Sequence, residues 1–336
     1  MAEATSVHTG RTAQRRQLVL AGLARLVLCI IVASGGEAIA QDRAVRIILP
    51  VATASGVDTI TRAAQPALAK ALGHPVVVEN QPGAGGIVGT QALVKAPPDG
   101  FTLSIVSNNH VIYPSVYKTL PFDPVADITP ITVVGSTPIV LVVNPKVPAK
   151  NAQELIALLK AKGGEMNYAS SGNGTILHLA AAMFLDETGT TAKHIPYKGV
   201  GPMLTDLIGG QVEFATAALP SVQQHIKSGA LRAIGVGAAQ RVAAAPDIPT
   251  MAEQGVPTYL VEGWFAVIGP AKMPAAEVAR IHDAVAAAFA SPDVKEAMAK
   301  QGNTIDVGST AAAQKFFPAE LAKYAKLVKK AGVELQ

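Results

Sequence analysis

The chain has 336 residues, of which 49% are apolar, 15% are charged and 4% are aromatic, with a formal net charge of +4. This length suffices for two ordinary domains or one large one, and the apolar fraction argues against intrinsic disorder. Lysine and arginine do not cluster on any predicted element, so the sequence does not support a nucleic-acid-binding protein, and no nucleic acid is expected as a partner.

Residues 1–40 have the pattern of an export signal. The basic pair Arg15-Arg16 precedes a mostly apolar run over residues 18–32, and Ala38-Ile39-Ala40 is a small-x-small cleavage site before Gln41. A membrane anchor is the alternative, but Arg25 interrupts the apolar run, which is shorter than the roughly 20 residues that a span needs. We therefore expect export to the periplasm, with cleavage near Ala40-Gln41.

The single cysteine, Cys29, lies inside this leader. Once the leader is removed, the protein has neither a thiol nor a disulfide, which excludes thiol chemistry and cysteine-based metal sites. A large exported domain can fold without disulfides because its own core is sufficient.

After Gln41 the hydrophobic pattern alternates between strands and helices. The predicted strands are Val45–Leu49, Val76–Glu79, Thr102–Val106, Ile139–Val143, Met166–Ala169, Lys193–Ile195, Val212–Thr216, Leu231–Gly235 and Phe265–Ile268. The predicted helices are Asp58–Leu72, Ile87–Lys95, Ala152–Lys162, Thr175–Glu187, Pro202–Ile208, Ala275–Ala290, Val294–Lys300 and Ala311–Ala331. This alternation predicts an α/β protein with a mainly parallel sheet.

Ligands of such proteins bind beyond the carboxyl ends of the strands, which selects the loops after Leu49, Val106, Ala169, Ile195 and Thr216. Two of these loops, residues 49–58 and 167–175, join a strand to a helix through small residues. In both loops, backbone N–H groups and the positive end of a helix dipole would point toward a bound ligand. We interpret them as the two sides of one cleft. Neither contains lysine or arginine, so an anion held there would be bound by neutral donors.

Capping explains part of both loops. Ser55 and Asp58 have the spacing of a capping box, and Thr175 suits the N-cap of the following helix. A functional role is compatible with this, with Ser55 donating to a ligand oxygen while Asp58 fixes the loop. His178, one turn into the second helix, either reaches the loop or is an ordinary packed histidine.

The glycine-rich stretch Gly83–Gly89 does not have a dinucleotide fingerprint. With glycines at 83 and 85, the pattern needs a third glycine at position 88, where Val88 stands. We interpret the stretch as a tight connection between a strand and a helix. The histidines lack metal-ligand spacing and the sequence has no nucleophile elbow, so we expect no cofactor, no metal site and no catalytic residue.

Many segments along the chain match the segments of one protein family, in the same order. They are Val45–Ile48, Asp58 with Arg62, Pro75–Gly86, Pro98–Leu103, Leu120–Pro124, Tyr168–Ser170, His178–Ala180, His194–Gly199, Gly209–Val212, and Pro249-Thr250 with Glu253 and Gly255. With these segments the chain resembles the tripartite tricarboxylate transporter substrate-binding proteins, the Bug-type periplasmic receptors. The match covers nearly the whole mature chain.

The resemblance implies a two-lobed periplasmic-binding-protein fold of the Venus-flytrap, type II kind. Each lobe would have a mainly parallel sheet flanked by helices, and two crossover strands would join the lobes. Residues 41–140 and 265–336 would form one lobe and residues 141–264 the other. The crossings are expected near Ile139–Val143 and Trp264–Ile268.

The resemblance also implies capture of a small organic acid and its delivery to a membrane permease. The acid would be a di- or tricarboxylate, an amino acid or an aromatic acid. In this family the two loops hold the ligand carboxylate between them. Carried over by position, the contacts are Val51, Ala52, Thr53, Ala54, Ser55 and Asp58 on one lobe, and Ser170, Ser171, Gly172, Asn173, Gly174, Thr175 and His178 on the other.

The first loop departs from the family pattern. The family usually has two adjacent glycines at the positions of Ala54 and Ser55, and an aromatic residue at that of Val51. A Cβ at each glycine position narrows the approach of the backbone to a ligand. We therefore expect ligand specificity to diverge at this loop.

Three other functions remain open. A sensor would use the same capture step for signalling. An enzyme would need a positioned acid, base or nucleophile, and the predicted cleft offers only Asp58 and His178, on opposite lobes. A transcription regulator can carry the same two-lobed fold as its effector domain. The export signal and the lack of an N-terminal helix-turn-helix argue against that last function.

Overall fold

The computed structural model describes residues 43–333 and 335. The predicted export signal, its cleavage site and Cys29 lie outside the described residues. The chain divides between Arg43 and Ala44 into two units, and the fold given below is that of the unit that begins at Ala44.

Ten strands alternate with helices along this unit. The strands are β1 Val45–Leu49, β2 Val76–Asn80, β3 Thr102–Ser107, β4 Ile128–Val143, β5 Asn167–Ser170, β6 Lys193–Pro196, β7 Phe214–Ala218, β8 Arg232–Val236, β9 Glu262–Pro270 and β10 Thr304–Ile305. The α-helices are α2 Gly56–Leu72, α3 Ile87–Val94, α4 Asn109–Ile112, α5 Ala152–Lys162, α6 Ile176–Thr188, α7 Val200–Gly209, α8 Leu219–Lys227, α9 Ala275–Ala290, α10 Pro292–Gln301 and α11 Thr310–Lys330. Short 3₁₀ turns are η1 Ala84–Gly86, η2 Tyr113–Ser115 and η3 Ala252–Gln254.

The strands pair in the order β2-β1-β3-β9-β4-β7-β5-β6, and both β8 and β10 also pair with β4. The trios β2-β1-β3 and β7-β5-β6 are parallel, as the alternating sequence pattern predicted. The pairings made by β4 and β9 are antiparallel. The fold is therefore α/β with a parallel part at each end of a mixed sheet.

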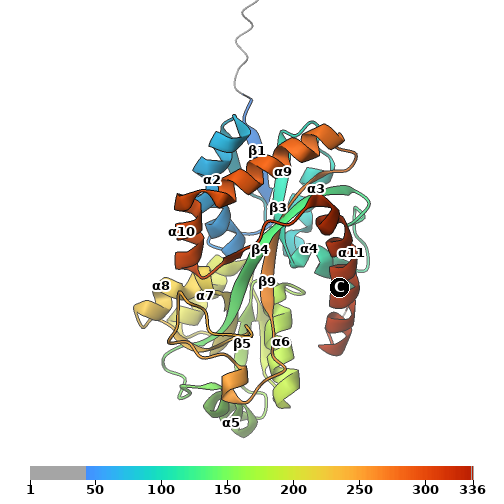
Figure 1. Ribbon diagram of the computed structural model, residues 1–336. Coiled ribbons are helices and arrows are strands. Elements are labelled where there is room, and N and C mark those ends of the chain that lie inside the picture. The colour runs from blue at the N-terminus through green and yellow to red at the C-terminus, as the bar shows by residue number, and fades with distance from the viewer. Residues whose placement is uncertain (1–42, 334, 336) are drawn as a thin grey trace, which may run out of the picture. The chain divides into compact units, whose positions relative to one another are not determined.

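Strand β4 belongs to both parts of this sheet. Its first part, residues 128–138, pairs with β9, and its second part, residues 139–143, pairs with β7 and β8. Figure 1 shows β4 and β9 running side by side between the upper and the lower group of elements. The sequence predicted only the second part, because Pro130, Gly135 and Pro138 interrupt the pattern of the first, which is also irregular in register.

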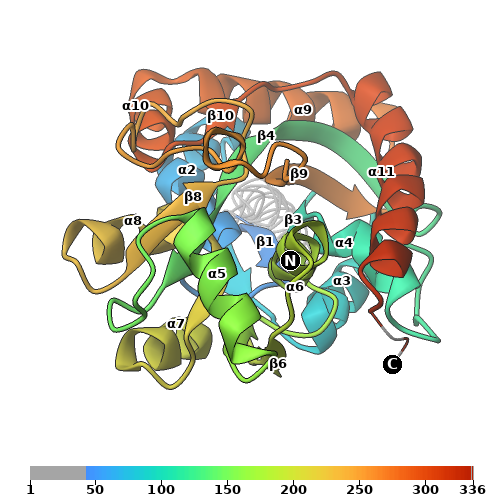
Figure 2. The same ribbon diagram turned by 90° about the horizontal axis from the view of Figure 1, so that it is seen from below.

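We call the two groups the first and the second lobe. The first lobe contains β1, β2, β3, β9, β10 and the start of β4, with α2, α3, α4, α9, α10 and α11 around them (Figure 1). The second lobe contains the end of β4 and β5–β8, with α5, α6, α7 and α8, which lie in front when the molecule is viewed from below (Figure 2). The two-lobed fold agrees with the expectation.

Each lobe has a hydrophobic core. In the first lobe Ile47, Leu49, Phe265 and Phe289 are buried between the sheet and helices α2 and α9. The other core cluster fills the second lobe around β4 and continues through the strands that join the lobes to Phe317 on α11. In the described residues, no helix is both long and apolar enough to span a bilayer.

Candidate functional site

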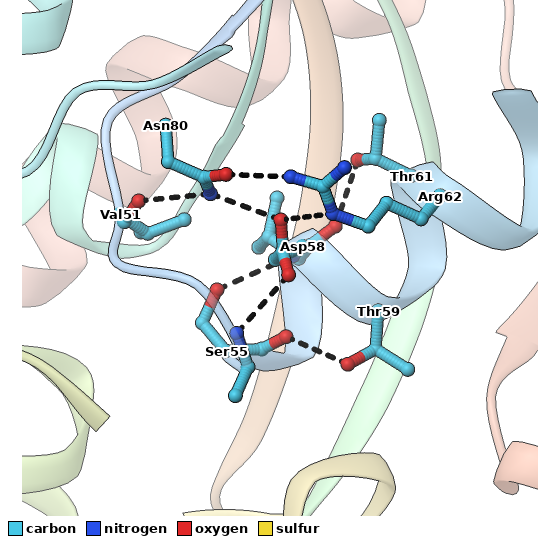
Figure 3. Close-up of polar contacts among 9 residues, drawn as sticks. Val51, Ser55, Asp58, Thr59, Thr61, Arg62 and Asn80 are labelled. Carbon is cyan, nitrogen blue, oxygen red and sulfur yellow. Dashed lines mark hydrogen bonds and ion pairs between the residues drawn. The ribbon is translucent and has the colours of Figure 1, made fainter. Parts of the chain in front are cut away.

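Asp58 holds the loop between β1 and α2 in place (Figure 3). Its Oδ2 accepts a hydrogen bond from the Ala54 backbone N–H at 3.0 Å. Its Oδ1 accepts from Arg62 Nε and from Asn80 Nδ2, each at 2.9 Å. The residue is only 5% exposed. These contacts give Asp58 the loop-fixing role that the sequence predicted, and they occupy both of its carboxylate oxygens.

Ser55 is the N-cap of α2, as predicted. Its Oγ accepts from the Asp58 backbone N–H at 3.2 Å, which satisfies one of the donors left over at the start of a helix. Since Oγ acts as the acceptor in this bond, the hydroxyl hydrogen is available to another group. The neighbouring Ala54 has a φ of 64°, a left-handed backbone conformation that favours glycine.

The loop between β5 and α6 is fixed in a similar way. Thr175 is the N-cap of α6, and its Oγ1 accepts from the His178 backbone N–H at 3.3 Å. Ser170 Oγ accepts from the Gly172 backbone N–H at 3.2 Å. The Gly174 N–H donates to Nδ1 of His178 at 3.0 Å. His178 therefore reaches the loop from inside, where it is 8% exposed.

His178 stacks on His194 of β6 directly behind this loop. The ring centroids are 3.8 Å apart and the planes differ by 7°. His194 Nε2 lies 2.7 Å from Ser170 Oγ. Burial, with a smaller contribution from His194, lowers the pKa of His178 to about 3, and burial lowers the pKa of His194 to about 4. Both rings are neutral at pH 7, which leaves Nδ1 of His178 free to accept.

The two loops line one cavity of about 730 Å³ between the lobes. The predicted site residues in its lining are Val51, Ala52, Ser55, Ser171, Gly172, Asn173 and Thr175. The predicted residues outside its lining are Thr53, Ala54, Asp58, Ser170, Gly174 and His178. Of the latter, Asp58, Ser170 and His178 hold the lining residues in place through the bonds given above.

The lobes touch each other around this cavity. A Cβ placed on Gly56 of α2 would lie 2.8 Å from the Cβ of Ala218 on the other lobe. A Cβ on Gly199 would lie 2.5 Å from that of Ala52. The Ile176 N–H, at the start of α6, donates to Asn109 Oδ1 at 2.8 Å across the same boundary. The β1–α2 and β5–α6 loops, which belong to different lobes, therefore lie close together in the structure.

The cavity also has walls that the predicted site omitted. The additional lining residues include Pro82–Gly86, Ser107–Asn109, Tyr117, Thr137, Ile139, Pro196–Val200, Ala218, Ser221, Gly263 and Trp264. The strand-end rule had selected three of these places, the loops after Val106, Ile195 and Thr216. Gly83–Gly86 does form a tight connection between β2 and α3 and lines the cavity as well. Thr137 and Trp264 lie on the strands that join the lobes, and no pattern in the sequence indicated that they line the cavity.

Within the described part of the chain, Lys198 is the only charged residue in the cavity lining. The first turns of α2, α6 and α8 reach the lining through Gly56, Ile176 and Ser221 and contribute partial positive charge. Such a lining suits an anion held by neutral donors. In the described part of the chain, no group of three or more histidine, cysteine, aspartate or glutamate side chains could hold a metal ion.

Comparison with known proteins places the chain in a family. The sequence model of the Tripartite tricarboxylate transporter family receptor matches residues 60–333. The chain belongs to this receptor family. BugT of Bordetella pertussis is 35% identical over 296 residues, which cover 88% of this chain and 91% of BugT.

Solved structures of similar proteins share the receptor fold. The periplasmic binding protein BugD is 31% identical, with a TM-score of 0.84 over 88% of this chain and 99% of BugD. A protein from R. palustris, solved with adipate, is 30% identical, with the same TM-score over 88% of this chain and 99% of its own. BugD is thus a periplasmic binding protein, and the R. palustris protein was solved with a dicarboxylate.

Proposed function

We propose that this receptor captures a small organic acid between its lobes in the periplasm and delivers it to a tripartite tricarboxylate-type permease. The β1–α2 and β5–α6 loops hold a carboxylate of the ligand. Closure occurs about β4 and β9, the strands that join the lobes, and the closed form docks on the permease. The receptor itself catalyses no reaction.

The observation that carries this proposal is the pair of loops that face one cavity from opposite lobes. Ser55 and Ser171 supply hydroxyl groups, and the starts of α2 and α6 supply partial positive charge. The described lining contains no aspartate or glutamate that would repel an anion. A carboxylate is the small anion that such neutral donors suit, and the adipate held by the R. palustris relative supports the same ligand class.

The role of each predicted residue follows from its position. Val51, Ala52, Ser55, Ser171, Gly172, Asn173 and Thr175 contact the ligand directly. Among the six predicted residues outside the lining, Asp58, Ser170 and His178 act indirectly, by fixing the loops that contain the contacting residues. In this assignment Asp58 does not meet the anion, because its two oxygens are already occupied by Ala54, Arg62 and Asn80.

Thermal unfolding in the presence of dicarboxylates, tricarboxylates, amino acids and aromatic acids tests the proposal. A ligand at about 100 times its Kd stabilises the folded protein by roughly 2.7 kcal/mol, so at least one acid is expected to raise the melting temperature. Neutral solutes of matched size serve as controls. If neutral solutes stabilise the protein and no acid in a broad panel does, the carboxylate assignment is contradicted.

A further inference from the structure

A second hollow, which we call the rear crevice, lies between the lobes beside α11. Its volume is about 520 Å³, against about 730 Å³ for the ligand cavity, and no predicted site residue lines it. The first lobe contributes Phe316 of α11, and the second lobe contributes Met183 of α6 and Leu260. The segment around Leu260 is tied to the second lobe, because the Val261 N–H donates to the Gly237 carbonyl at 2.8 Å. The rear crevice is therefore bounded by both lobes.

The rear crevice and the ligand cavity lie on opposite faces of β4. Ser136 lines only the rear crevice, and the next residue, Thr137, lines only the cavity. Successive side chains of a strand point to opposite faces of a sheet, so the strand itself separates the two hollows. On β9, Gly263 and Trp264 belong to both linings and form part of the wall between them. Figure 2 shows α11 next to β4 and β9, away from β6 and α7, whose connecting loop lines the cavity.

This arrangement makes the two hollows change in opposite directions when the lobes rotate. A rotation about the joining strands that brings the cavity loops together moves the groups on the other face apart. In the structure the loops are together, as the close approach of Gly56 to Ala218 and of Gly199 to Ala52 shows. The rear crevice is correspondingly wide. In a form with the cavity open, the walls of the rear crevice would be closer to each other.

The rear crevice leaves apolar surface uncovered in this closed arrangement. Leu260 is 56% exposed, and Ser136 and Ala239 have side chains too short to fill the space in front of it. Packed protein contains few voids of this size, and apolar surface is more stable when it is buried. Closure thus forms contacts at the cavity and leaves apolar surface in water behind the joining strands.

We propose that the rear crevice sets the balance between the open and the closed form of the receptor, and thereby its affinity for the acid. Its apolar walls meet in the open form and favour that form until a ligand holds the cavity loops together. This inference rests on the proposed closure about β4 and β9. A side chain that fills the rear crevice of the closed form shifts the balance toward closure. Affinity then rises, because it scales with the fraction of receptor in the binding-competent form.

Larger side chains in the rear crevice test this proposal without changing the cavity lining. Ser136→Leu fills the rear crevice from the first lobe, and Ala239→Leu fills it from the second. Each added side chain fits only the wider crevice of the closed form, so each variant is expected to bind the acid roughly fivefold more tightly. The matched controls are Ser228→Leu and Ala243→Leu, at exposed positions that line neither hollow.

Two measurements are made on each purified receptor. Calorimetry gives the Kd for succinate, adipate, citrate and benzoate, and X-ray scattering gives the radius of gyration without any acid. In both crevice variants we expect a lower Kd for the acids that the wild type binds and a smaller radius of gyration without acid. Both controls should match the wild type, and thermal unfolding confirms that each variant is folded.

The scattering measurement keeps this inference separate from the proposed function. If both crevice variants keep the radius of gyration and the Kd of the wild type, or bind more weakly, the rear crevice does not set the balance. Equal changes in the controls would overturn the inference in the same way. If the wild type binds none of the four acids, that result counts against the proposed function, and the radius of gyration without acid still decides on the rear crevice.

Discussion

His178 and His194 stack face to face, with ring centroids 3.8 Å apart, behind the loop that begins α6. Neither ring lines the cavity. His178 accepts the Gly174 N–H, and His194 lies within hydrogen-bonding distance of Ser170, so the pair fixes the loop from its inner side. A second proton on His178 would occupy Nδ1, which accepts the Gly174 N–H, so this bond persists only while the ring is neutral.

This stack makes the protein less stable in acid. The pKa of His178 is lowered to about 3 and those of His194 and the buried His110 to about 4, against about 6.5 in an unfolded chain. Below pH 6.5 the unfolded chain takes up protons that the fold does not, so the free energy of unfolding falls as the pH drops toward 4. Each such histidine contributes at most about 1.4 kcal/mol per pH unit. Urea unfolding at a series of pH values measures the slope.

The share of one histidine in this slope can be isolated. In His178→Asn the Asn Oδ1 can still accept the Gly174 N–H but does not titrate, so the slope between pH 6.5 and 4 should become shallower. The same substitution at His225, a partly buried position on α8, is the matched control. An unchanged slope in His178→Asn would show that this histidine is not held neutral by the fold.

Closure of the lobes should depend on the absence of a side chain at Gly56. In Gly56→Ala the new Cβ would lie 2.8 Å from that of Ala218, and overpacking of this kind typically costs 1–3 kcal/mol. Under the proposed closure about β4 and β9, this contact belongs to the closed form. We therefore expect ligand affinity to fall by roughly tenfold or more while thermal stability without ligand changes little. Calorimetry and thermal unfolding separate the two effects.

The double variant Gly56→Ala with Ala218→Gly provides the internal check. Removing the opposing Cβ should restore much of the affinity, because the clash needs both methyl groups. Gly201→Ala on α7 is the control for adding a methyl group, since a Cβ there meets no atom within 4 Å. Loss of affinity in this control, or no recovery in the double variant, would argue against steric control of closure.

Ala54 stores backbone strain in the first loop. Its φ of 64° costs an L-residue roughly 1–2 kcal/mol. Glycine avoids this cost, but it also gives the unfolded chain more conformational freedom, which offsets part of the gain in stability. Ala54→Gly should therefore raise the free energy of unfolding by about 0.5–1 kcal/mol. Ala322→Gly, at an exposed position inside α11, should instead lower it by about 1 kcal/mol. Urea unfolding distinguishes the two signs.

The same loop should influence which acid is bound. Replacing both Ala54 and Ser55 by glycine removes the Ser55 hydroxyl from the cavity. It also introduces the two adjacent glycines that the family resemblance leads us to expect at these positions. We expect a changed order of affinities across the acid panel, measured by calorimetry. An unchanged order would place the specificity of this receptor outside the first loop.

Trp264 provides a direct optical signal of binding. It is the only tryptophan in the sequence, it lines the cavity, and its indole Nε1 donates to Glu320 of α11 at 2.8 Å. A ligand that displaces water beside the ring should shift its emission to shorter wavelength, and Trp264→Phe should abolish the signal. If calorimetry detects binding while the emission of the wild-type protein stays constant, the ligand does not reach the joining strands.

Local features of the site were predictable because they depend on residues a few positions apart. Ser55 and Thr175 cap their helices through bonds to the residue three positions later, and the sequence contains both partners of each bond. Gly73 ends α2 in a left-handed conformation for the same kind of local reason. The alternation of predicted strands and helices was likewise sufficient to indicate an α/β fold with a mainly parallel sheet, and the matching segments indicated the receptor family.

Only the tertiary structure decided which distant residues share the cavity. The stack of His178 on His194 depends on the pairing of β5 with β6, and the contact of Gly56 with Ala218 depends on how the lobes meet. Thr137, Ala218 and Trp264 line the same cavity through the register of β4 against β7 and β9. Such register results from packing across the whole sheet, and no segment of sequence contains both partners. The sequence by itself determined the two loops and their caps, and the sheet pairing determined what surrounds the ligand between them.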